Sequence, residues 1–344
     1  MDFSALCKLP IIQGPMAGGA TTPELVAAVS NTGAIGSLAG SLLSPSVLRT
    51  QVERIRSLSN QPFILNFFVQ RTPAPSREDI AAAAELLRPI WTSLGWTELP
   101  QPKQWCEDFD AQFETLLALR PAAASFTFGI LDAYQVERLH AAGILAIGTV
   151  TTVEEALAWQ AIGADAVIAS GIEAGGHRGT FIGRQEDATL GARDLWPAVA
   201  QAVDIPVIAA GGIMHGADIQ VALELGAAAV QMGTAFLVTD ESGIHPAYKG
   251  RLLAAEGQPT RLTRSFSGRY ARGIENRFMR DMATVEAQVP PYPIQNALTG
   301  SIRAAAAASN DTELMSLWAG TGVARARPMS AAQLIKLLAS EWQS

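Results

Sequence analysis

The chain has 344 residues but very little lysine, cysteine or histidine, and this scarcity argues against several kinds of chemistry. Schiff-base catalysis needs a lysine at the binding site, and no lysine ends a predicted strand. The histidines show no metal-ligand spacing, and two cysteines provide neither a disulfide framework nor a thiolate metal cluster. We therefore expect no metal site. The residues concerned are Lys8, Lys103, Lys249, Lys336, His140, His177, His215, His245, Cys7 and Cys106.

A basic excess and a long apolar run are also missing. The net charge of -7 and the pI near 5.2 argue against a nucleic-acid partner, which needs a basic face. No run of about 18 apolar residues is present, so no membrane span is expected. The first ten residues lack the basic and apolar regions of a signal peptide. We expect a cytoplasmic protein that acts on small molecules, as a monomer or homodimer.

Short apolar strands alternate with helical patterns through the first two thirds of the chain. The strands are continuous apolar runs, which is typical of a parallel sheet buried on both faces. Eight such units ending near residue 238 predict an α/β fold, the (β/α)8 TIM barrel, over an open doubly wound sheet, because no strand resembles an edge strand. The predicted strands cover residues 10–13, 34–38, 62–68, 122–128, 144–149, 166–169, 206–210 and 228–232.

Two stretches do not fit the repeat. Residues 69–120 hold helical patterns at 77–94 and 105–119, and we interpret them as an insertion because neither has enough apolar surface for its own core. Residues 239–344 follow the barrel of residues 1–238 as a mostly helical segment, which we expect to pack on the barrel and cover its mouth. Its helices are predicted at 247–256, 294–309, 311–318 and 331–342.

Glycines follow the seventh and eighth predicted strands, where TIM barrels often bind phosphate. Glycine amides and a helix N-terminus bind phosphate through N–H dipoles, and a threonine can add its hydroxyl. Because no lysine or arginine belongs to either loop, the backbone would hold the phosphate, which suits a permanently bound cofactor such as FMN. The alternative is that these glycines only make tight turns. The two loops contain Ala210, Gly211, Gly212, Gln231, Met232, Gly233 and Thr234.

A histidine lies in the glycine-rich loop after the sixth predicted strand, in AVIASGIEAGGHRGTF at residues 166–181. The glycines let backbone approach a ligand closely, and the His177 imidazole can titrate near neutral pH. His177 is therefore the candidate catalytic residue. The alternative is a tight loop whose histidine satisfies a carbonyl. His140 and His215 are expected to be surface or packing residues.

Five segments together resemble the class I nitronate monooxygenases, FMN-dependent barrel enzymes once called 2-nitropropane dioxygenases. The most specific are GGHRG and SGRxARG, the second within SGRYARGIENR. The resemblance implies oxidation of alkyl nitronates, usually propionate 3-nitronate, with O2 to a carbonyl compound and nitrite. The other similar segments are PIIQGPMAGGATTPELVAAVSNTGAIGS, PVIAAGGIMHG and LGAAAVQMGTAF.

The resemblance also implies roles for individual residues. His177 would position the nitronate or accept a proton near the flavin, and Ser267 would help to line the substrate pocket. Arg269 would help to line it too; the alternative is that Ser267 belongs to a structural turn and that Arg269 is a solvated arginine. The family commonly has glutamine where this chain has Ser170, and often alanine where it has Gly14. The implied FMN contacts are Pro15, Met16, Ala17, Asn66, Ser170, Gly171, Gly175, Gly176, Ala210, Gly211, Gly212, Gln231, Met232, Gly233 and Thr234.

Two other functions fit the same sequence. An FMN-dependent enoyl-acyl-carrier-protein reductase shares the barrel and a similar EAGGH motif but needs NADH, and the HRG and SGRxARG pieces favour the monooxygenase. The second alternative is a barrel that binds flavin without catalysing a reaction. The placement of His177 between glycines argues against it. A reaction like that of inosine-monophosphate dehydrogenase needs a cysteine after a late strand, and neither Cys7 nor Cys106 is there.

Overall fold

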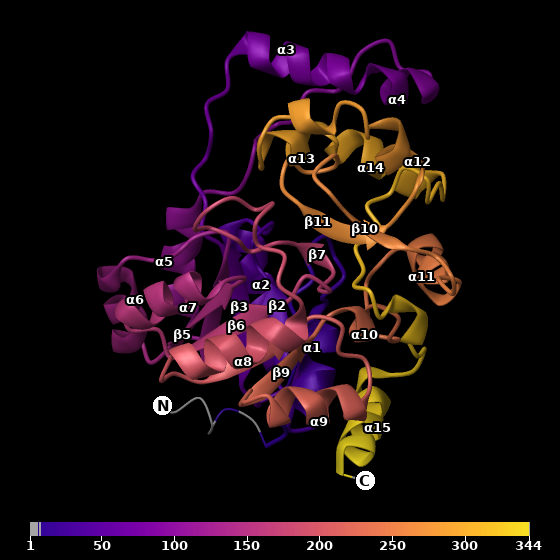
Figure 1. Cartoon of the computed structure of the whole chain (residues 1–344). Helices are drawn as coiled ribbons and strands as arrows, with labels where there is room; N and C mark the ends of the chain where they lie inside the picture. The colour runs from indigo at the N-terminus through magenta and orange to yellow at the C-terminus, as the bar shows by residue number, and fades with distance from the viewer. Residues whose placement is uncertain (1–5, 7, 344) are drawn as a thin grey trace.

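The computed structural model describes residue 6 and residues 8–343, and its centre is a barrel of eight parallel strands (Figure 1). The barrel closes where Ile12 bridges Ile35 and the Gln13 N–H donates to Ile35 O at 2.8 Å. The predicted TIM barrel is confirmed. Cys7 lies outside the described residues. The strands, in sheet order, are β1 (Ile11–Gln13), β9 (Ala229–Met232), β8 (Val207–Ala210), β6 (Ala166–Ser170), β5 (Leu145–Val150), β4 (Ala123–Thr127), β3 (Phe63–Phe68) and β2 (Gly36–Ala39).

Helices surround the barrel, and most begin at a residue that can cap them. Thr22, Ser44, Asp108, Asp132 and Thr152 each accept a backbone N–H from the first turn that follows. The strands are buried on both faces, which is why they read as continuous apolar runs. The helices are α1 (Pro23–Ser30), α2 (Pro45–Leu58), α5 (Phe109–Leu119), α6 (Ala133–Ala141), α7 (Val153–Ala161), α8 (Ala192–Ala202), α9 (Gly216–Glu224) and α10 (Thr234–Leu237).

The insertion predicted at residues 69–120 divides in two: the part at residues 77–93 lies over the C-terminal segment and away from the barrel, whereas α5 packs beside the barrel against α2 (Figure 1). The helix predicted at 77–94 is two helices, α3 (Arg77–Leu86) and α4 (Arg88–Ser93), with proline in the first turn of the second. Leu87 and Trp91 of the insertion share one hydrophobic cluster with Phe278 of the C-terminal segment. This part of the insertion therefore buries its apolar side chains against a segment far away in the sequence, whereas Phe113 and Leu116 of α5 belong to the cluster around the barrel.

The C-terminal segment adds a small sheet that the sequence did not predict. In this three-stranded antiparallel sheet, β11 (Ala271–Ile274) lies between β10 (Thr260–Thr263) and β7 (Gly176–His177), which belongs to the loop after β6. The remaining elements are α11 (Pro246–Leu253), α12 (Arg277–Asp281), η2 (Glu286–Gln288), α13 (Ile294–Leu298), α14 (Gly300–Ala308), η3 (Val323–Arg325) and α15 (Ala331–Gln343). No helix among the described residues is both long and apolar enough to cross a membrane.

The helix predicted at 311–318 is wrong. Residues 312–315 form a turn, and the residues that follow pair with the edge of β11, where the Ile274 N–H donates to Leu317 O at 2.9 Å and Trp318 bridges Gly273. Its apolar residues are buried against the rest of the C-terminal segment without any helix. Tertiary packing has here overridden local helix propensity.

Candidate active site

A cavity of about 490 Å³ lies at the carboxyl ends of the barrel strands, beneath the C-terminal segment. This volume is within the usual range of small-molecule and cofactor sites, about 300–1,000 Å³. Its floor comes from the loops after β1, β3, β6, β8 and β9, and its cover includes Tyr292, Asn296, Arg303 and Trp318. One wall is thus made by the barrel and the other by residues more than fifty positions beyond it.

The structure brings nearly all sequence-predicted site residues to this cavity. The exceptions are Gly171 and Ser267, which do not line it. Gly171 packs so closely on α8 that a Cβ there would lie 2.5 Å from Ala192 Cα. Arg269 does not line the cavity either. Those that do are Pro15, Met16, Ala17, Asn66, Ser170, Gly175, Gly176, His177, Ala210, Gly211, Gly212, Gln231, Met232, Gly233 and Thr234.

The imidazole of His177 is held by a hydroxyl from the C-terminal segment. His177 pairs with Ala271 across β7 and β11, and its Nε2 lies 2.8 Å from Ser267 Oγ. The Ser267 hydroxyl also lies 3.0 Å from Arg269 O, which can only accept; we assign its proton to that carbonyl, so that Ser267 accepts from His177. In this assignment Nε2 carries the imidazole proton. Nδ1 then has a free lone pair, with no hydrogen-bond partner among the described residues.

Three aromatic rings surround this imidazole, with centroids 5.6 Å (Phe128), 5.7 Å (Tyr292) and 5.4 Å (Trp318) away. Burial among them, together with the positive charges of Arg269 and Arg303, lowers the pKa of His177 to about 3. The imidazole is consequently neutral at neutral pH, and Nδ1 can act as a proton acceptor.

This depressed pKa predicts how stability depends on pH. Between about pH 3 and the ordinary value of 6.5, the unfolded chain binds a proton at His177 that the folded apoprotein does not bind. The folded state should thus lose stability as pH falls through this window, at up to about 1.4 kcal/mol per pH unit for this proton. Urea unfolding between about pH 4 and pH 7 measures the slope. His177→Gln should have a shallower slope, and equal slopes would contradict the assignment.

Two arginines fix the backbone around His177. Arg178 is buried, and its guanidinium donates to Ser170 O at 2.9 Å, Gly171 O at 2.6 Å and Ala188 O at 3.2 Å. Arg269 donates to the carbonyls of Arg178 and Thr180 and lies 4.3 Å from the ring centroid of Phe128. Arg269 is thus neither solvated nor in the cavity wall. It joins the SGRxARG segment to the GGHRG loop.

Sequence reasoning missed Glu155, whose carboxylate binds the backbone of the chain that follows His177. This buried carboxylate in the first turn of α7 accepts from the N–H and hydroxyl of Thr151 and from the N–H groups of Phe181 and Ile182. It therefore ties the end of β5 to the chain after His177. An acidic residue in a first helical turn is common, and the sequence carried no signal for this role.

Glu173, in the middle of the glycine-rich loop, is structural. Its carboxylate accepts the Ala192 N–H at 2.8 Å, at the start of α8, where the N-cap residue Gly191 has no side chain to do so. The negative charge also complements the positive end of the helix dipole.

The glycine loops after β8 and β9 leave N–H groups available for an anion. Those of Gly212, Gly233 and Thr234 have no acceptor among the described residues. A Cβ added at Gly233 would meet nothing nearer than Met16 Sδ at 3.9 Å, so the space beside it is open. Thr234 Oγ1 accepts the Gly320 N–H at 2.9 Å, which leaves its own proton free to donate. This cradle fits a phosphate group.

The N-terminus of α9, expected to contribute to that cradle, is already used. Asp218 accepts the N–H groups of Met214 and His215, and Glu341 accepts that of Gly216. Arg325 pairs with Asp218 at 2.8 Å and donates to Gly212 O at 2.8 Å. The loop is therefore fixed by side chains from the far end of the chain, and it offers its own glycine amides without the helix.

Two polar side chains are suited to the edge of a flat ring. The Asn66 amide nitrogen donates to Ser125 Oγ at 3.0 Å, which leaves its oxygen as an acceptor. Ser170 lines the cavity, and its hydroxyl has no partner among the described residues. An acceptor and a hydroxyl at the base of an apolar cavity fit the polar edge of an isoalloxazine.

Sequence reasoning also missed the residues of the cover, because they belong to short helices without a recognisable motif. Arg303 donates to Asn296 O at 2.7 Å and Asn296 Oδ1 at 3.0 Å, while its buried Nε has no partner. Burial lowers its pKa to about 10, so it remains charged at neutral pH. Burial also raises the pKa of Tyr292, which therefore stays a neutral phenol.

Comparison with known proteins extends over the whole chain. The family model described as nitronate monooxygenase matches residues 3–341. The chain is 41% identical over 334 residues to a probable nitronate monooxygenase of Bacillus subtilis (strain 168), covering 96% of this chain and 95% of the relative. Both the barrel and the C-terminal segment therefore have counterparts in that relative.

Two solved structures are also similar. A nitroalkane oxidase from Streptomyces ansochromogenes matches with a TM-score of 0.91 and 42% identity, covering 99% of this chain and 97% of that one. FabK from Thermotoga maritima matches with a TM-score of 0.76 and 28% identity, covering 98% and 93%. The higher identity and TM-score both belong to the nitroalkane oxidase.

Proposed function

The chain belongs to the nitronate monooxygenase family and is an oxidoreductase; from this premise we propose that it oxidises alkyl nitronates with O2, using FMN, to a carbonyl compound and nitrite. One observation carries the proposal: a neutral His177, with Nδ1 unprotonated, faces a cavity whose far side is a phosphate cradle. A flavin phosphate in the cradle and a nitronate beside His177 would share this one space.

The residues present fit FMN. The N–H groups of Gly212, Gly233 and Thr234 would hold the phosphate, and Asn66 and Ser170 would bind the ring edge. When bound, FMN accepts electrons from the substrate and passes them to O2. The chain itself binds, orients and desolvates the reactants.

His177 would act as an acceptor. Because Nε2–H is donated to Ser267, only the Nδ1 lone pair remains for the substrate. Of the two roles that the family resemblance implies, proton acceptance is therefore the one the tautomer supports. A nitronate is already an electron-rich anion and needs no strong base.

Arg303 supports a substrate with a second negative charge, as in propionate 3-nitronate. It is the arginine that lines the cavity, and no lysine of the described residues lines it. The positive charge of its guanidinium could pair with a carboxylate in the cavity. A charge-assisted hydrogen bond is worth about 1.5–3 kcal/mol, or a factor of about 10–100 in affinity.

Oxygen uptake with nitrite release by the FMN-loaded protein tests the function, with propionate 3-nitronate and propyl-1-nitronate as a pair of substrates that differ in the carboxylate. We expect both to be oxidised, with kcat/KM at least about tenfold higher for the first. Equal kcat/KM values for the two substrates would show that Arg303 does not select between them. NADH oxidation without nitronate oxidation would instead point to a reductase, and a yellow protein that does neither to a flavin-binding barrel without catalysis.

A further inference from the structure

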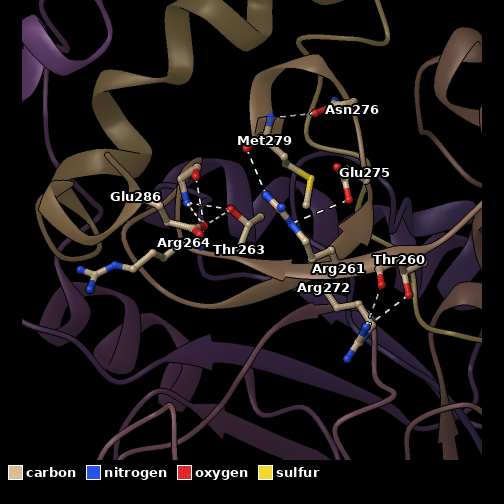
Figure 2. Close-up of polar contacts among 10 residues, drawn as sticks. Thr260, Arg261, Thr263, Arg264, Arg272, Glu275, Asn276, Met279 and Glu286 are labelled. Atoms are coloured by element: carbon tan, nitrogen blue, oxygen red, sulfur yellow. Dashed lines mark hydrogen bonds and ion pairs between the residues drawn. The ribbon is translucent and has the colours of Figure 1, made fainter. Parts of the chain in front are cut away.

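A single carboxylate joins two segments of the cover beside His177. Figure 2 shows Glu286, at the start of η2, reaching to Thr263 and Arg264 at the end of β10. Its Oε1 accepts from Thr263 Oγ1, from Arg264 N at 2.7 Å, and from Ser265 Oγ at 3.0 Å and Ser265 N at 3.3 Å. Four donors from three consecutive residues thus converge on one oxygen.

These three residues begin the turn that carries Ser267. The N–H groups of Ser267 and Gly268 both donate to Arg264 O, at 3.2 Å and 2.7 Å. The backbone of the turn is tightly packed at Gly268, which has a φ of +81°. A Cβ at this position would lie 2.1 Å from Pro290 O. We therefore expect that a shift of the Arg264 backbone would also shift Ser267.

Other side chains hold the turn only by its carbonyl groups. Gln295 donates to Ser265 O at 2.7 Å, and the Thr299 hydroxyl donates to Phe266 O. Among the described residues, Glu286 is the acceptor of the Arg264 N–H, whereas the Ser265 N–H also donates to Thr263 Oγ1 at 3.0 Å. Removal of Glu286 would leave the Arg264 N–H and the hydroxyl protons of Thr263 and Ser265 without this acceptor, and losing a partner costs a donor up to about 1–3 kcal/mol.

We propose that Glu286 is a positioning residue for His177. By fixing the turn, it keeps the Ser267 hydroxyl between His177 Nε2 and Arg269 O, which holds the imidazole in the tautomer with Nδ1 unprotonated. Glu286 touches neither the cavity nor His177 and acts only through Ser267. Its effect on turnover rests on the proposed function, whereas its effect on the tautomer does not.

The tautomer can be read directly by 15N NMR of the FMN-loaded, substrate-free protein labelled at histidine. The chain has four histidines, and His177→Gln identifies the signal of His177. We expect Nε2 protonated and Nδ1 unprotonated in the parent protein, and a shift toward a mixture in Glu286→Ala. Nitronate turnover should fall at least about fivefold, but less than in a variant without the imidazole.

Three further variants separate positioning from general destabilisation. Glu286→Gln retains an acceptor oxygen and should recover most of the tautomer signal, and Glu286→Asp, a milder change should Glu286→Ala fail to fold, should give an intermediate signal. Glu313→Ala is the matched control, because this carboxylate caps α12 in the same segment and does not contact the turn. It should leave the His177 signal as in the parent.

A double variant decides whether Glu286 acts through Ser267. If it does, Glu286→Ala adds little to the loss of turnover in Ser267→Ala, whereas independent effects multiply. A parental His177 signal in Glu286→Ala, or a multiplicative loss in the double variant, would overturn the proposal. A tautomer shift in a protein that oxidises no nitronate would uphold the positioning role and refute the proposed function.

Discussion

Replacing His177 with alanine is expected to lower nitronate turnover by a factor of about one hundred or more while FMN stays bound, because a positioned proton acceptor contributes about 10²–10⁴. The cofactor should remain because its expected contacts are the glycine loops, Asn66 and Ser170. Oxygen uptake measures kcat/KM, and the flavin absorbance of the purified protein measures FMN content.

His140→Ala is the control for this variant. His140 lies in α6, where its Nε2 is 2.9 Å from the Asp165 carboxylate, and it does not line the cavity. It should retain parental turnover. A near-parental rate for His177→Ala would remove His177 from the mechanism, and loss of flavin together with activity would show that the histidine holds the cofactor.

Gly233→Val is expected to yield a folded protein that binds FMN weakly or not at all. The backbone of Gly233 has a φ of -101°, which valine adopts readily, and an added Cβ meets no protein atom within 3.9 Å. The side chain would fill the space beside the free N–H groups that are proposed to hold the phosphate. Loss of two such bonds, at about 1.5–3 kcal/mol each, weakens binding by a factor of about 10²–10⁴.

The FMN dissociation constant measures this effect, and circular dichroism checks that the apoprotein is folded. Gly250→Val is the matched control, because Gly250 lies in α11 with nothing within 4 Å of an added Cβ and does not line the cavity. It should bind FMN like the parent. Undiminished flavin content in Gly233→Val would place the phosphate elsewhere.

The barrel could be predicted from the sequence because its signals are local. A parallel strand buried on both faces is a continuous apolar run, and a helix that follows it has its own period and cap. The small sheet of β7, β10 and β11 could not be predicted, since it pairs two residues of the central loop with a segment about 95 positions later. The pairing of Leu317 and Trp318 with β11, where a helix was predicted, depends on the same sheet.

The residues of the site also divide into those that the sequence predicted and those that it did not. The glycine-rich loops that follow the strands predicted the residues of the cavity floor, because a barrel brings the carboxyl ends of all its strands to one face. The cover was not marked, and Arg303 and Tyr292 were found only in the folded chain. Two expectations changed with tertiary context: the N-terminus of α9 is occupied by Asp218 and Glu341, and the half-buried Arg269 donates to backbone carbonyls of the loop that carries His177.

The sequence by itself determined the barrel, and it predicted the glycine loops proposed to hold phosphate and the imidazole proposed to react, since each follows from residue type and spacing along a few neighbouring residues. The tertiary structure alone decided the state of that imidazole. Its tautomer depends on Ser267, 90 residues away, and its neutrality on burial and on the charges of Arg269 and Arg303. Hydrogen bonding and desolvation act through space, so no local pattern around His177 could encode them.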